Sequence, residues 1–470
     1  MAAAAVTEQR LTIWQSIREA IRGSQRDFTE GSISRAIVLL AIPMVLEMVM
    51  ESLFAITNVF WVTRLGANAI ATVGLTESML TLVFAVAIGV SMSTTAMVAR
   101  RIGEKDPRAA ATAAVQAIVL GVVLAVLMGV PGYWLAPRLL ELMGAPADLV
   151  ATGKQYTALV LGGSITVLLL FLNNAIFRGA GDASIAMRVL WFSNLINMAL
   201  DPCFIFGLGP FPELGVTGAG VSTVIGRGSG VLYQLWILGS GKSRVLIRRE
   251  DLRIVPAVIT SLMRVSVTGI LQFAIAHTSW IALVRFISGF GASAVAGYTI
   301  GIRIFIFAIL PSWGLSGAAA TMAGQNLGAR KPQRAERAVY LTGFYNMIVL
   351  AVIAIAFIGM PEAIVRLFTD DPAVVPHAVD CLRILGYGNV VYAWGMVLVQ
   401  GFNGAGDTVT PTMINVVGFW LCEIPLAWGL AHPMGMGVRG VFISIPTAEL
   451  VMTVLAAAMF MRGRWKTRQI

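Results

Sequence analysis

Twelve long apolar stretches follow one another along the chain, each separated from the next by a short polar, glycine-containing or proline-containing segment. A helix needs about 20 apolar residues, at a rise of about 1.5 Å each, to cross the hydrocarbon core of a bilayer. Each stretch meets that length, so the pattern predicts an all-α polytopic membrane protein with twelve transmembrane helices. Their predicted extents are 36–63, 69–98, 111–136, 152–176, 185–208, 215–238, 257–288, 293–322, 338–360, 378–402, 409–431 and 438–461.

Four short motifs recur in the second half of the chain in nearly one register. The motif GANAIA at Gly66 returns as GASAVA at Gly291, and GAGD at Gly179 returns at Gly404, both 225 positions later. Gly103 and Gly328 have the same spacing, and GVTG at Gly215 matches GVRG at Gly437 after 222 positions. Each copy holds six predicted spans. Since six is even, the copies share one orientation, which predicts two six-helix bundles related by a pseudo-two-fold axis along the membrane normal.

Composition supports a membrane protein and limits the functions that we expect of it. The chain is 57% hydrophobic and only 12% charged, against about 25% charged in an average soluble domain. Its net charge of +10 comes mostly from loops on one side of the predicted spans. The positive-inside rule therefore places both termini and the basic loops in the cytoplasm, and we expect no nucleic-acid partner. The sequence has no P-loop, zinc-protease or serine-hydrolase motif, so we expect no enzymatic activity.

These patterns divide the chain into five parts. The first, residues 1–34, is a predicted cytoplasmic arm in which Leu11, Trp14, Ile17 and Ile21 recur at helical spacing. This arm is either a short helix on the membrane surface or a solvated segment. The other parts are an N-terminal six-helix bundle (35–238), a basic cytoplasmic connector (239–256), a C-terminal six-helix bundle (257–461) and a basic cytoplasmic tail (462–470).

The first span carries polar residues in its middle, where they are costly. Glu47, Glu51 and Asn58 fall within about 40° of one another on a helix, among Leu, Met, Val and Phe. A carboxyl group at bilayer depth indicates an ion or substrate pathway by default. We therefore treat this face as a candidate site for a coupling cation.

Further in-span polar residues could complete such a site. Asn197 and Asp201 lie four residues apart in span five, and Thr223 lies in span six. Their oxygens suit a hard cation such as Na⁺, and a carboxyl group held away from water suits proton exchange. The alternative is that Asn and Thr only join helices by hydrogen bonds. In the second copy of the repeat, Gln272 is equivalent to Glu47 and Glu423 is equivalent to Asp201, and both are secondary candidates. Glu449 is interpreted as structural.

The GAGD motif precedes a span in both halves of the chain. We interpret it as a tight turn in which Asp182 and Asp407 cap the following helix. A phosphate-binding loop is the alternative, but no strand precedes the motif.

At this point the sequence resembles a known family. IPMVLEMVMESLFAITNVFWVTRLG, FRGAGD, NLINMALDPCFIFGLG, GQNLGARKPQRAERAV and FNGAGDTVTP are similar, in this order and spacing, to segments of the multidrug and toxic compound extrusion (MATE) family. The resemblance covers about residues 30 to 460. It implies twelve helices around a central cavity, alternating access, and efflux of cationic amphiphilic compounds in exchange for Na⁺ or H⁺.

The resemblance also implies which residues hold the coupling ion. The family's first-half cation site matches Asn58, Asn197, Asp201 and Thr223, which could hold Na⁺; Asn58 stands where the family usually has Asp. Our hypothesis is that Glu51 or Glu47 supplies the missing charge. Gln272 and Gln400 stand in the second-half regions where some members carry acids, so coupling through the second half is less expected.

The resulting expectation is a monomeric secondary transporter that needs no cofactor beyond its coupling ion. Its partners would be small organic substrates and membrane lipid. Two alternatives remain at this point: a flippase for lipid-linked saccharides, whose cavity should carry several in-span Arg or Lys residues, and a membrane scaffold that transports nothing.

Overall fold

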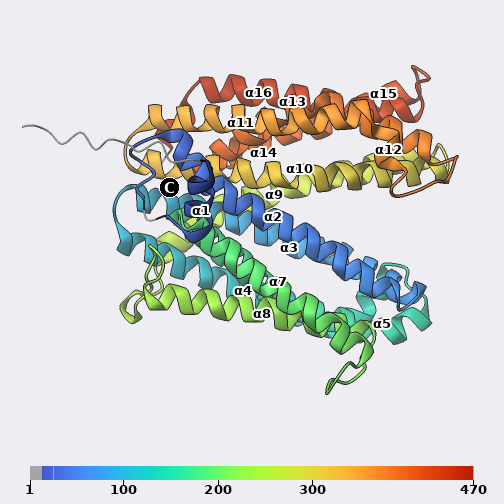
Figure 1. The fold of residues 1–470 in the computed structure, drawn as a ribbon, viewed down its shortest axis with the longest axis horizontal. Helices are drawn as coiled ribbons and strands as arrows, with labels where there is room; N and C mark the ends of the chain where they lie inside the picture. The colour runs from blue at the N-terminus through green and yellow to red at the C-terminus, as the bar shows by residue number, and fades with distance from the viewer. Residues whose placement is uncertain (1–12, 25, 469) are drawn as a thin grey trace, which may run out of the picture.

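The computed structural model describes residues 13–24, 26–468 and 470. Residues 1–12 of the predicted arm, including Leu11, therefore lie outside the described residues, as do Gln25 and Gln469. The described part of the chain is helical and contains no strand. It forms two bundles of six spans each (Figure 1), which confirms the predicted fold class.

The helices follow the predicted spans closely. The first bundle contains α2 (Ile33–Thr63), α3 (Ala67–Gly103), α4 (Pro107–Leu142), α5 (Ala147–Gly162) with α6 (Ser164–Ala180), α7 (Ala183–Phe206) and α8 (Val216–Ser240). The second contains α9 (Pro256–Ser288), α10 (Ala292–Gly328), α11 (Pro332–Gly359), α13 (Val375–Gly404), α14 (Val409–Asn415) with η2 (Val416–Glu423) and α15 (Ile424–Ala431), and α16 (Val438–Met461). Short elements outside the spans are α1 (Ile13–Arg22), η1 (Arg249–Asp251), α12 (Pro361–Val365) and η3 (Arg464–Thr467).

Eleven of the spans among the described residues are long and apolar enough to cross a membrane on those grounds alone. The remaining one, α8, has the length but carries Arg227, Gln234 and several Gly and Ser residues, which lower its mean hydropathy. Two spans are interrupted. The fourth is divided between α5 and α6 at Gly163, and the eleventh contains the π-helical turns of η2.

The sequence repeat is reproduced in the contacts between the bundles. A Cβ atom added to Gly314 of α10 would lie 2.6 Å from the backbone oxygen of Met44 on α2. The equivalent Gly89 of α3 meets α9 in the same way, 2.7 Å from the backbone nitrogen of Ile270. Neither position has room for a side chain, because the first helix of each repeat packs closely against the second helix of the other repeat.

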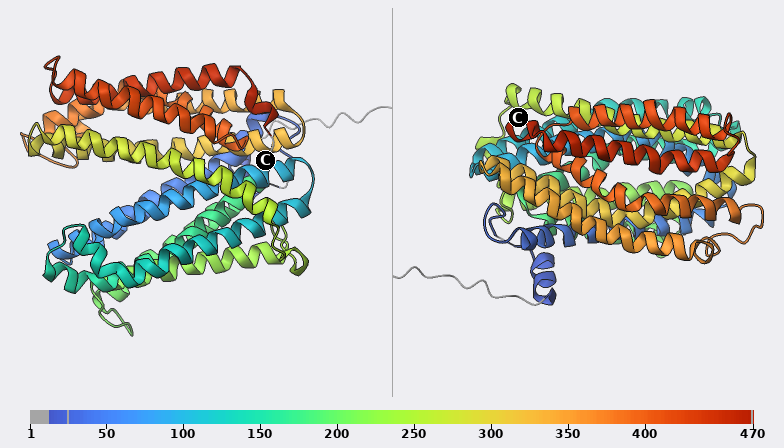
Figure 2. Two further views of the ribbon diagram at one scale, coloured as in Figure 1. Left: turned by 180° about the vertical axis from the view of Figure 1, so that it is seen from behind. Right: turned by 90° about the horizontal axis from the view of Figure 1, so that it is seen from above.

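The bundles converge at the end that carries the basic loops and both described ends of the chain, and they diverge toward the opposite end (Figures 1 and 2). At the convergent end a Cβ atom on Gly103 would lie 1.9 Å from the backbone oxygen of Gln325, and one on Gly328 would lie 2.1 Å from that of Arg100. Gln325 also donates from Nε2 to the backbone oxygen of Gly179 at 2.9 Å. Helices of the two bundles are therefore in backbone contact at this end.

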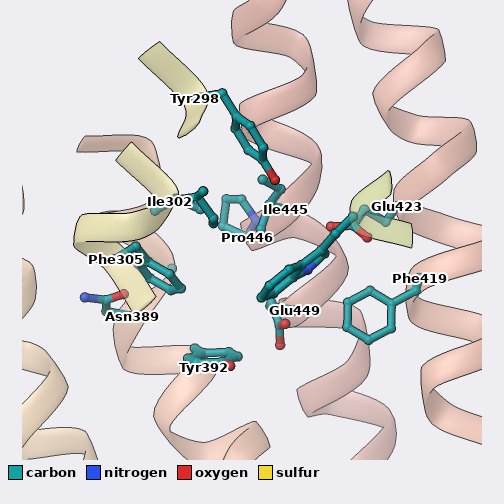
Figure 3. Close-up of a pocket in the computed structure, with 13 residues that line it drawn as sticks. Tyr298, Ile302, Phe305, Asn389, Tyr392, Phe419, Glu423, Ile445, Pro446 and Glu449 are labelled. Carbon is teal, nitrogen blue, oxygen red and sulfur yellow. The ribbon is translucent and has the colours of Figure 1, made fainter. Parts of the chain in front are cut away.

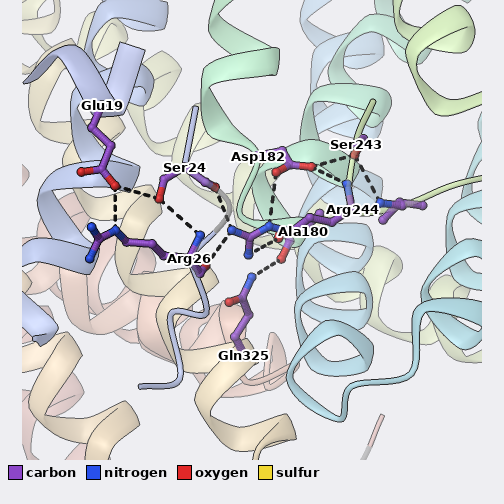
Figure 4. A network of polar contacts seen from close by, with 10 residues as sticks. Glu19, Ser24, Arg26, Ala180, Asp182, Ser243, Arg244 and Gln325 are labelled. Carbon is purple, nitrogen blue, oxygen red and sulfur yellow. Dashed lines mark hydrogen bonds and ion pairs between the residues drawn. The ribbon is translucent and has the colours of Figure 1, made fainter. Parts of the chain in front are cut away.

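The segment between α1 and α2 bridges the two bundles at the convergent end. Arg244, from the connector, donates to the backbone oxygens of Ser24 and Arg26 at 2.9 and 2.7 Å (Figure 4). From the second bundle, Arg334 donates to the backbone oxygens of Glu30 and Gly31, both at 2.8 Å. The segment between α1 and α2 is thus bound both by the connector and by the second bundle.

The GAGD motif forms a turn in both repeats, but the predicted helix cap is present in only one of them. Asp407 accepts from the backbone N–H of Thr410, at 3.3 Å, in the first turn of α14. Asp182 makes no such bond to α7. It instead accepts from Ser243 Oγ and from the backbone N–H of Arg244, both at 2.8 Å, and so fixes the connector (Figure 4). Burial raises the pKa of Asp182 above its ordinary value, although Arg244 and Ser243 favour its charged form.

Candidate functional site

Glu47 lies inside the first bundle as part of a polar network between three helices. Its Oε1 accepts from Asn174 Nδ2 at 3.1 Å and lies 3.4 Å from Nη1 of Arg178, both on α6. The network continues to α8, because Gln234 donates from Nε2 to Oδ1 of Asn174 at 2.7 Å. Glu47 is 2% exposed, and these partners replace water at Oε1, whereas Oε2 has no hydrogen-bond partner among the described residues. The contacts join α2, α6 and α8 to one another.

Glu51 lies one turn further along α2 and reaches a different helix. Asn194 of α7 donates from Nδ2 to Glu51 Oε2 at 3.2 Å. Asn194, Asn197 and Asp201 are spaced by three and four residues, so they share one face of α7. Glu51 therefore lies against the same face as the predicted Asn–Asp pair.

Asp201 is fully buried where α7 packs against α8. Its Oδ1 accepts a hydrogen bond from Ser222 of α8, while Oδ2 has no hydrogen-bond partner among the described residues. Asn197, 2% exposed, likewise has both side-chain polar atoms without a partner in the described part of the chain. Buried polar atoms are almost always hydrogen-bonded in proteins. These unpaired oxygens are the donor type that a monovalent cation binds.

Small residues on α8 bring the two helices together at this point. Gly218, Ser222, Gly226 and Gly230 recur every four residues and form one face of α8. A Cβ atom on Gly226 would lie 2.8 Å from Cβ of Asn197 and 3.0 Å from the backbone oxygen of Ser193. This close approach allows the short Ser222 side chain to reach Asp201. Sequence reasoning missed Ser222, although the four-residue spacing of small residues was a usable signal.

The remaining first-half candidates are less closely connected. The Thr223 hydroxyl donates to the backbone oxygen of Ala219 at 2.8 Å, within its own helix. Asn58 is partly exposed, and no hydrogen bond among the described residues joins it to Asn197, Asp201 or Thr223. The structure thus brings Glu51, Asn197 and Asp201 to one helix face, with Ser222 facing them from α8.

The first bundle also contains a buried basic residue, Arg227. Arg227 of α8 is 8% exposed and has no ion-pair partner within 4 Å among the described residues. Its guanidinium carbon lies 5.8 Å from the ring centre of Phe54 and 5.9 Å from that of Phe84. Arg227 therefore rests on aromatic rings of α2 and α3.

The second-half candidates lie apart from one another. Gln272 of α9 is buried, and its Oε1 has no partner in the described part of the chain. Gln400 accepts from Asn403 Nδ2 at 3.4 Å, within α13. Glu423, at the end of η2, is buried, accepts from Ser279 Oγ and lines a cavity that Glu449 of α16 also lines. The interpretation of Glu449 as structural left this carboxyl pair unnoticed.

Comparison with known proteins identifies the chain. A family model, MatE, matches residues 43–203 and 269–428, which is more than half of the chain. The chain belongs to the MatE family. The matched ranges begin within the first span of each repeat, so the family model recognises both copies of the duplication.

Relatives within the MatE family extend over nearly the whole chain. The probable multidrug resistance protein NorM of Thermotoga maritima is 25% identical over 93% of this chain and 94% of its own length. The FAD transporter of Shewanella oneidensis is also 25% identical, over 90% of this chain and 93% of its own length. The first is named as a multidrug resistance protein and the second as a transporter.

Solved MatE-family structures have the same fold. The crystal structure of a MATE protein in the straight conformation superposes with a TM-score of 0.86 at 25% identity and covers 96% of this chain and 98% of that chain. An outward-facing multidrug resistance MATE family transporter gives a TM-score of 0.87 at 24% identity, over 97% and 99% of the two chains. Family membership and fold together make this chain a multi-pass membrane protein of a bacterial transporter family.

Proposed function

We propose that this protein is a secondary active efflux transporter that exports organic cations in exchange for Na⁺ or H⁺. Its multidrug-resistance relatives support the export of organic compounds. The observation that carries the coupling is the buried pair Asn197 and Asp201, whose unpaired polar atoms at the α7–α8 contact suit a cation. Glu51, held by Asn194 on the same helix face, contributes the second negative charge.

The proposed cycle follows from the two bundles. With the basic end closed, a coupling cation enters from the divergent end and binds at Asp201 and Asn197. Substrate leaves on that side, the bundles rock about the α2–α10 and α3–α9 contacts, and the cation leaves toward the basic end. Moving one charge down 100 mV releases about 2.3 kcal/mol, which sustains a substrate gradient of roughly fiftyfold at about 1.4 kcal/mol per tenfold.

Ethidium export from proteoliposomes under separate Na⁺ and pH gradients tests this proposal. We expect wild-type export under one of the gradients and at least a tenfold slower rate for Asp201→Asn. Asp370→Asn is the matched control, because that carboxyl group is 87% exposed. Equal export by Asp201→Asn and wild type would refute coupling at Asp201. Folded protein with no export under either gradient would favour a scaffold, or a flippase if lipid-linked saccharide moved instead.

Arg227 favours one second candidate, export of an organic anion. A guanidinium group without an ion-pair partner among the described residues, lying on two aromatic rings, suits an anionic substrate with a flat ring system. One relative is named as an FAD transporter. FAD transport by the same proteoliposomes, lost in Arg227→Gln and retained in the exposed control Arg366→Gln, would establish this candidate in place of cation export.

A further inference from the structure

A separate cavity lies inside the second bundle, between α9, α10, α13, η2 and α16 (Figure 3). Trp280, Tyr298 and Tyr392 contribute aromatic rings to its wall, and Glu423 and Glu449 contribute carboxyl groups. The wall is therefore apolar apart from a few polar groups, as ligand pockets generally are.

The two carboxyl groups have no basic partner in the described part of the protein. No Lys, Arg or His among the described residues lies within ion-pair distance of Glu423 or Glu449. Glu423 has one hydrogen bond, from Ser279, and Glu449 has none in the described part of the chain. The two groups interact electrostatically with each other. Because charged groups held away from water are costly unless they are paired, a site with two carboxyl groups and no basic partner suits a ligand that brings a positive charge.

Asn389 is a second, independent sign of a ligand. This α13 residue lines the cavity and is fully buried, yet neither its Oδ1 nor its Nδ2 has a hydrogen-bond partner among the described residues. Figure 3 shows its amide beside Phe305 at the edge of the cavity. An amide held in this way offers both a donor and an acceptor to a bound molecule.

Two backbone irregularities support the placement of the carboxyl groups. Glu423 is the last residue of the π-helical turns of η2, and such turns are frequent at functional sites. Pro446 interrupts α16 one turn before Glu449, which removes one backbone hydrogen bond inside the helix. Gly418 permits the close contact of η2 with α16, since a Cβ atom there would lie 2.0 Å from Cγ of Met452.

We propose that this cavity binds an organic cation, held by Glu423 and Glu449 and stacked against Trp280 and Tyr392. The aromatic rings decide between an organic and an inorganic cation. Trp and Tyr faces attract a diffuse organic cation, whereas a small metal ion needs several oxygen ligands or retained waters. The proposal rests on the proposed function and adds a substrate-binding site in the second bundle to the coupling site in the first.

The test is equilibrium binding of radiolabelled tetramethylammonium, a compact organic cation, to the full-length protein in nanodiscs, with no ion gradient. We expect Glu423→Gln and Glu449→Gln each to weaken the affinity at least tenfold. The matched control is Glu141→Gln, an exposed carboxyl group at the end of α4, which should bind as wild type does. Trp280→Leu keeps an apolar side chain but removes the aromatic face, and should weaken binding by about threefold to tenfold.

The outcomes separate this proposal from the proposed function. Affinity within twofold of wild type in both glutamate variants would overturn the site, and so would equal losses in Glu141→Gln. Elution of each variant as one monodisperse peak shows that a loss of binding is not a loss of fold. Because the measurement uses no gradient, a failure of coupling at Asp201 leaves its result unchanged.

Discussion

The two bundles share one fold and one duplicated sequence, yet the carboxyl groups inside their spans have different partners. In the first bundle, Glu47 has Arg178 and Asn174 as partners and Glu51 has Asn194. In the second, Glu449 has no hydrogen-bond or ion-pair partner among the described residues. The first bundle therefore pairs one of its in-span acids, Glu47, with a basic residue, and the second leaves two acids facing a cavity without one.

The repeat register shows where the bundles diverged. Asp201 and Glu423 are 222 positions apart and keep an acid in both copies. Arg227 and Glu449 are also 222 apart, and here the charge is reversed. The duplicated scaffold has thus exchanged the sign of the charge at one in-span position. The difference indicates that stability and ligand binding place separate demands on the same helix positions.

The largest effect on stability is expected from breaking the internal pair of the first bundle. Arg178→Met removes the cation beside Glu47 and leaves a buried carboxyl group with Asn174 alone. We expect a loss of about 2 kcal/mol in unfolding free energy, below the usual range because the Arg178 side chain is 22% exposed. Thermal unfolding in detergent, followed by intrinsic fluorescence, should show a Tm lower by several degrees.

The matched control for Arg178→Met is Arg366→Met. Arg366 pairs with Glu362 at 2.8 Å, but both side chains are more than half exposed, so its loss should cost about 0.5 kcal/mol or less. Equal Tm changes in the two variants would contradict the internal neutralisation of Glu47.

An effect of similar size is expected at the α7–α8 contact. Gly226→Ala would force a Cβ atom to within 2.8 Å of Asn197, and such overpacking costs typically about 1–3 kcal/mol. It should also separate Ser222 from Asp201 and slow ion-coupled export. Gly228→Ala is the control on the same helix, because its Cβ atom would lie 3.7 Å from the nearest side chain.

The two bundles also differ at the position of Gly226. Its equivalent in the second bundle, 222 positions later, is already Ala448. The close approach that Gly226 permits is thus specific to the first bundle, whereas η2 and α16 of the second bundle approach at Gly418 instead. If Gly226→Ala kept wild-type export and Tm, the small-residue face of α8 would not be what positions Asn197 and Asp201.

The sequence predicted the scaffold well because its signals are local. Twelve apolar stretches and a repeat of 225 residues suffice to predict two six-helix bundles, and contacts at Gly89 and Gly314 reproduce that register. Partners across helices depend on how each helix is rotated and where it crosses its neighbours. The roles of Arg178 and Glu449 could not be read from spacing along the chain, and Ser222 was signalled only by the four-residue spacing of small residues on α8.

The GAGD motif shows the same limit at a single residue. Identical tetrapeptides cap a helix at Asp407 and fix the connector at Asp182. The difference arises because only the first copy has Ser243 and Arg244 beside it. A local motif therefore predicted the turn in both copies, but tertiary contacts decided what its carboxyl group binds.

A small effect of opposite sign is expected in the second bundle. Glu449→Gln removes a carboxyl group that has no hydrogen-bond partner among the described residues, so no favourable contact is lost. We expect stability in the absence of ligand to be unchanged or to rise by up to about 1 kcal/mol. The same Tm measurement, with Glu141→Gln as the control, checks this. A clear decrease in Tm would mean that Glu449 is structural after all.

The smallest effect on stability is expected in α1, the short helix before the first bundle. Among the described residues the second bundle has no equivalent helix, since the connector before it holds only the three residues of η1. Glu19 of α1 binds Arg26 at 2.7 Å and Arg35 of α2 at 2.8 Å. Although burial raises the pKa of Glu19, the hydrogen bonds from Arg35 and Arg26 outweigh it and hold that pKa below its ordinary value of 4.5. The folded state therefore favours the charged form, so the stabilisation is complete above pH 4.5 and is lost as the pH falls through the lowered pKa.

Hydrogen exchange in residues 13–22, corrected for its intrinsic pH dependence, should rise a few-fold at low pH, since a partly exposed pair contributes about 0.5–1 kcal/mol. Glu19→Gln should show the faster exchange already at about pH 7 and no further rise, whereas unchanged exchange in that variant would mean that α1 is held to the bundle by its apolar contacts alone.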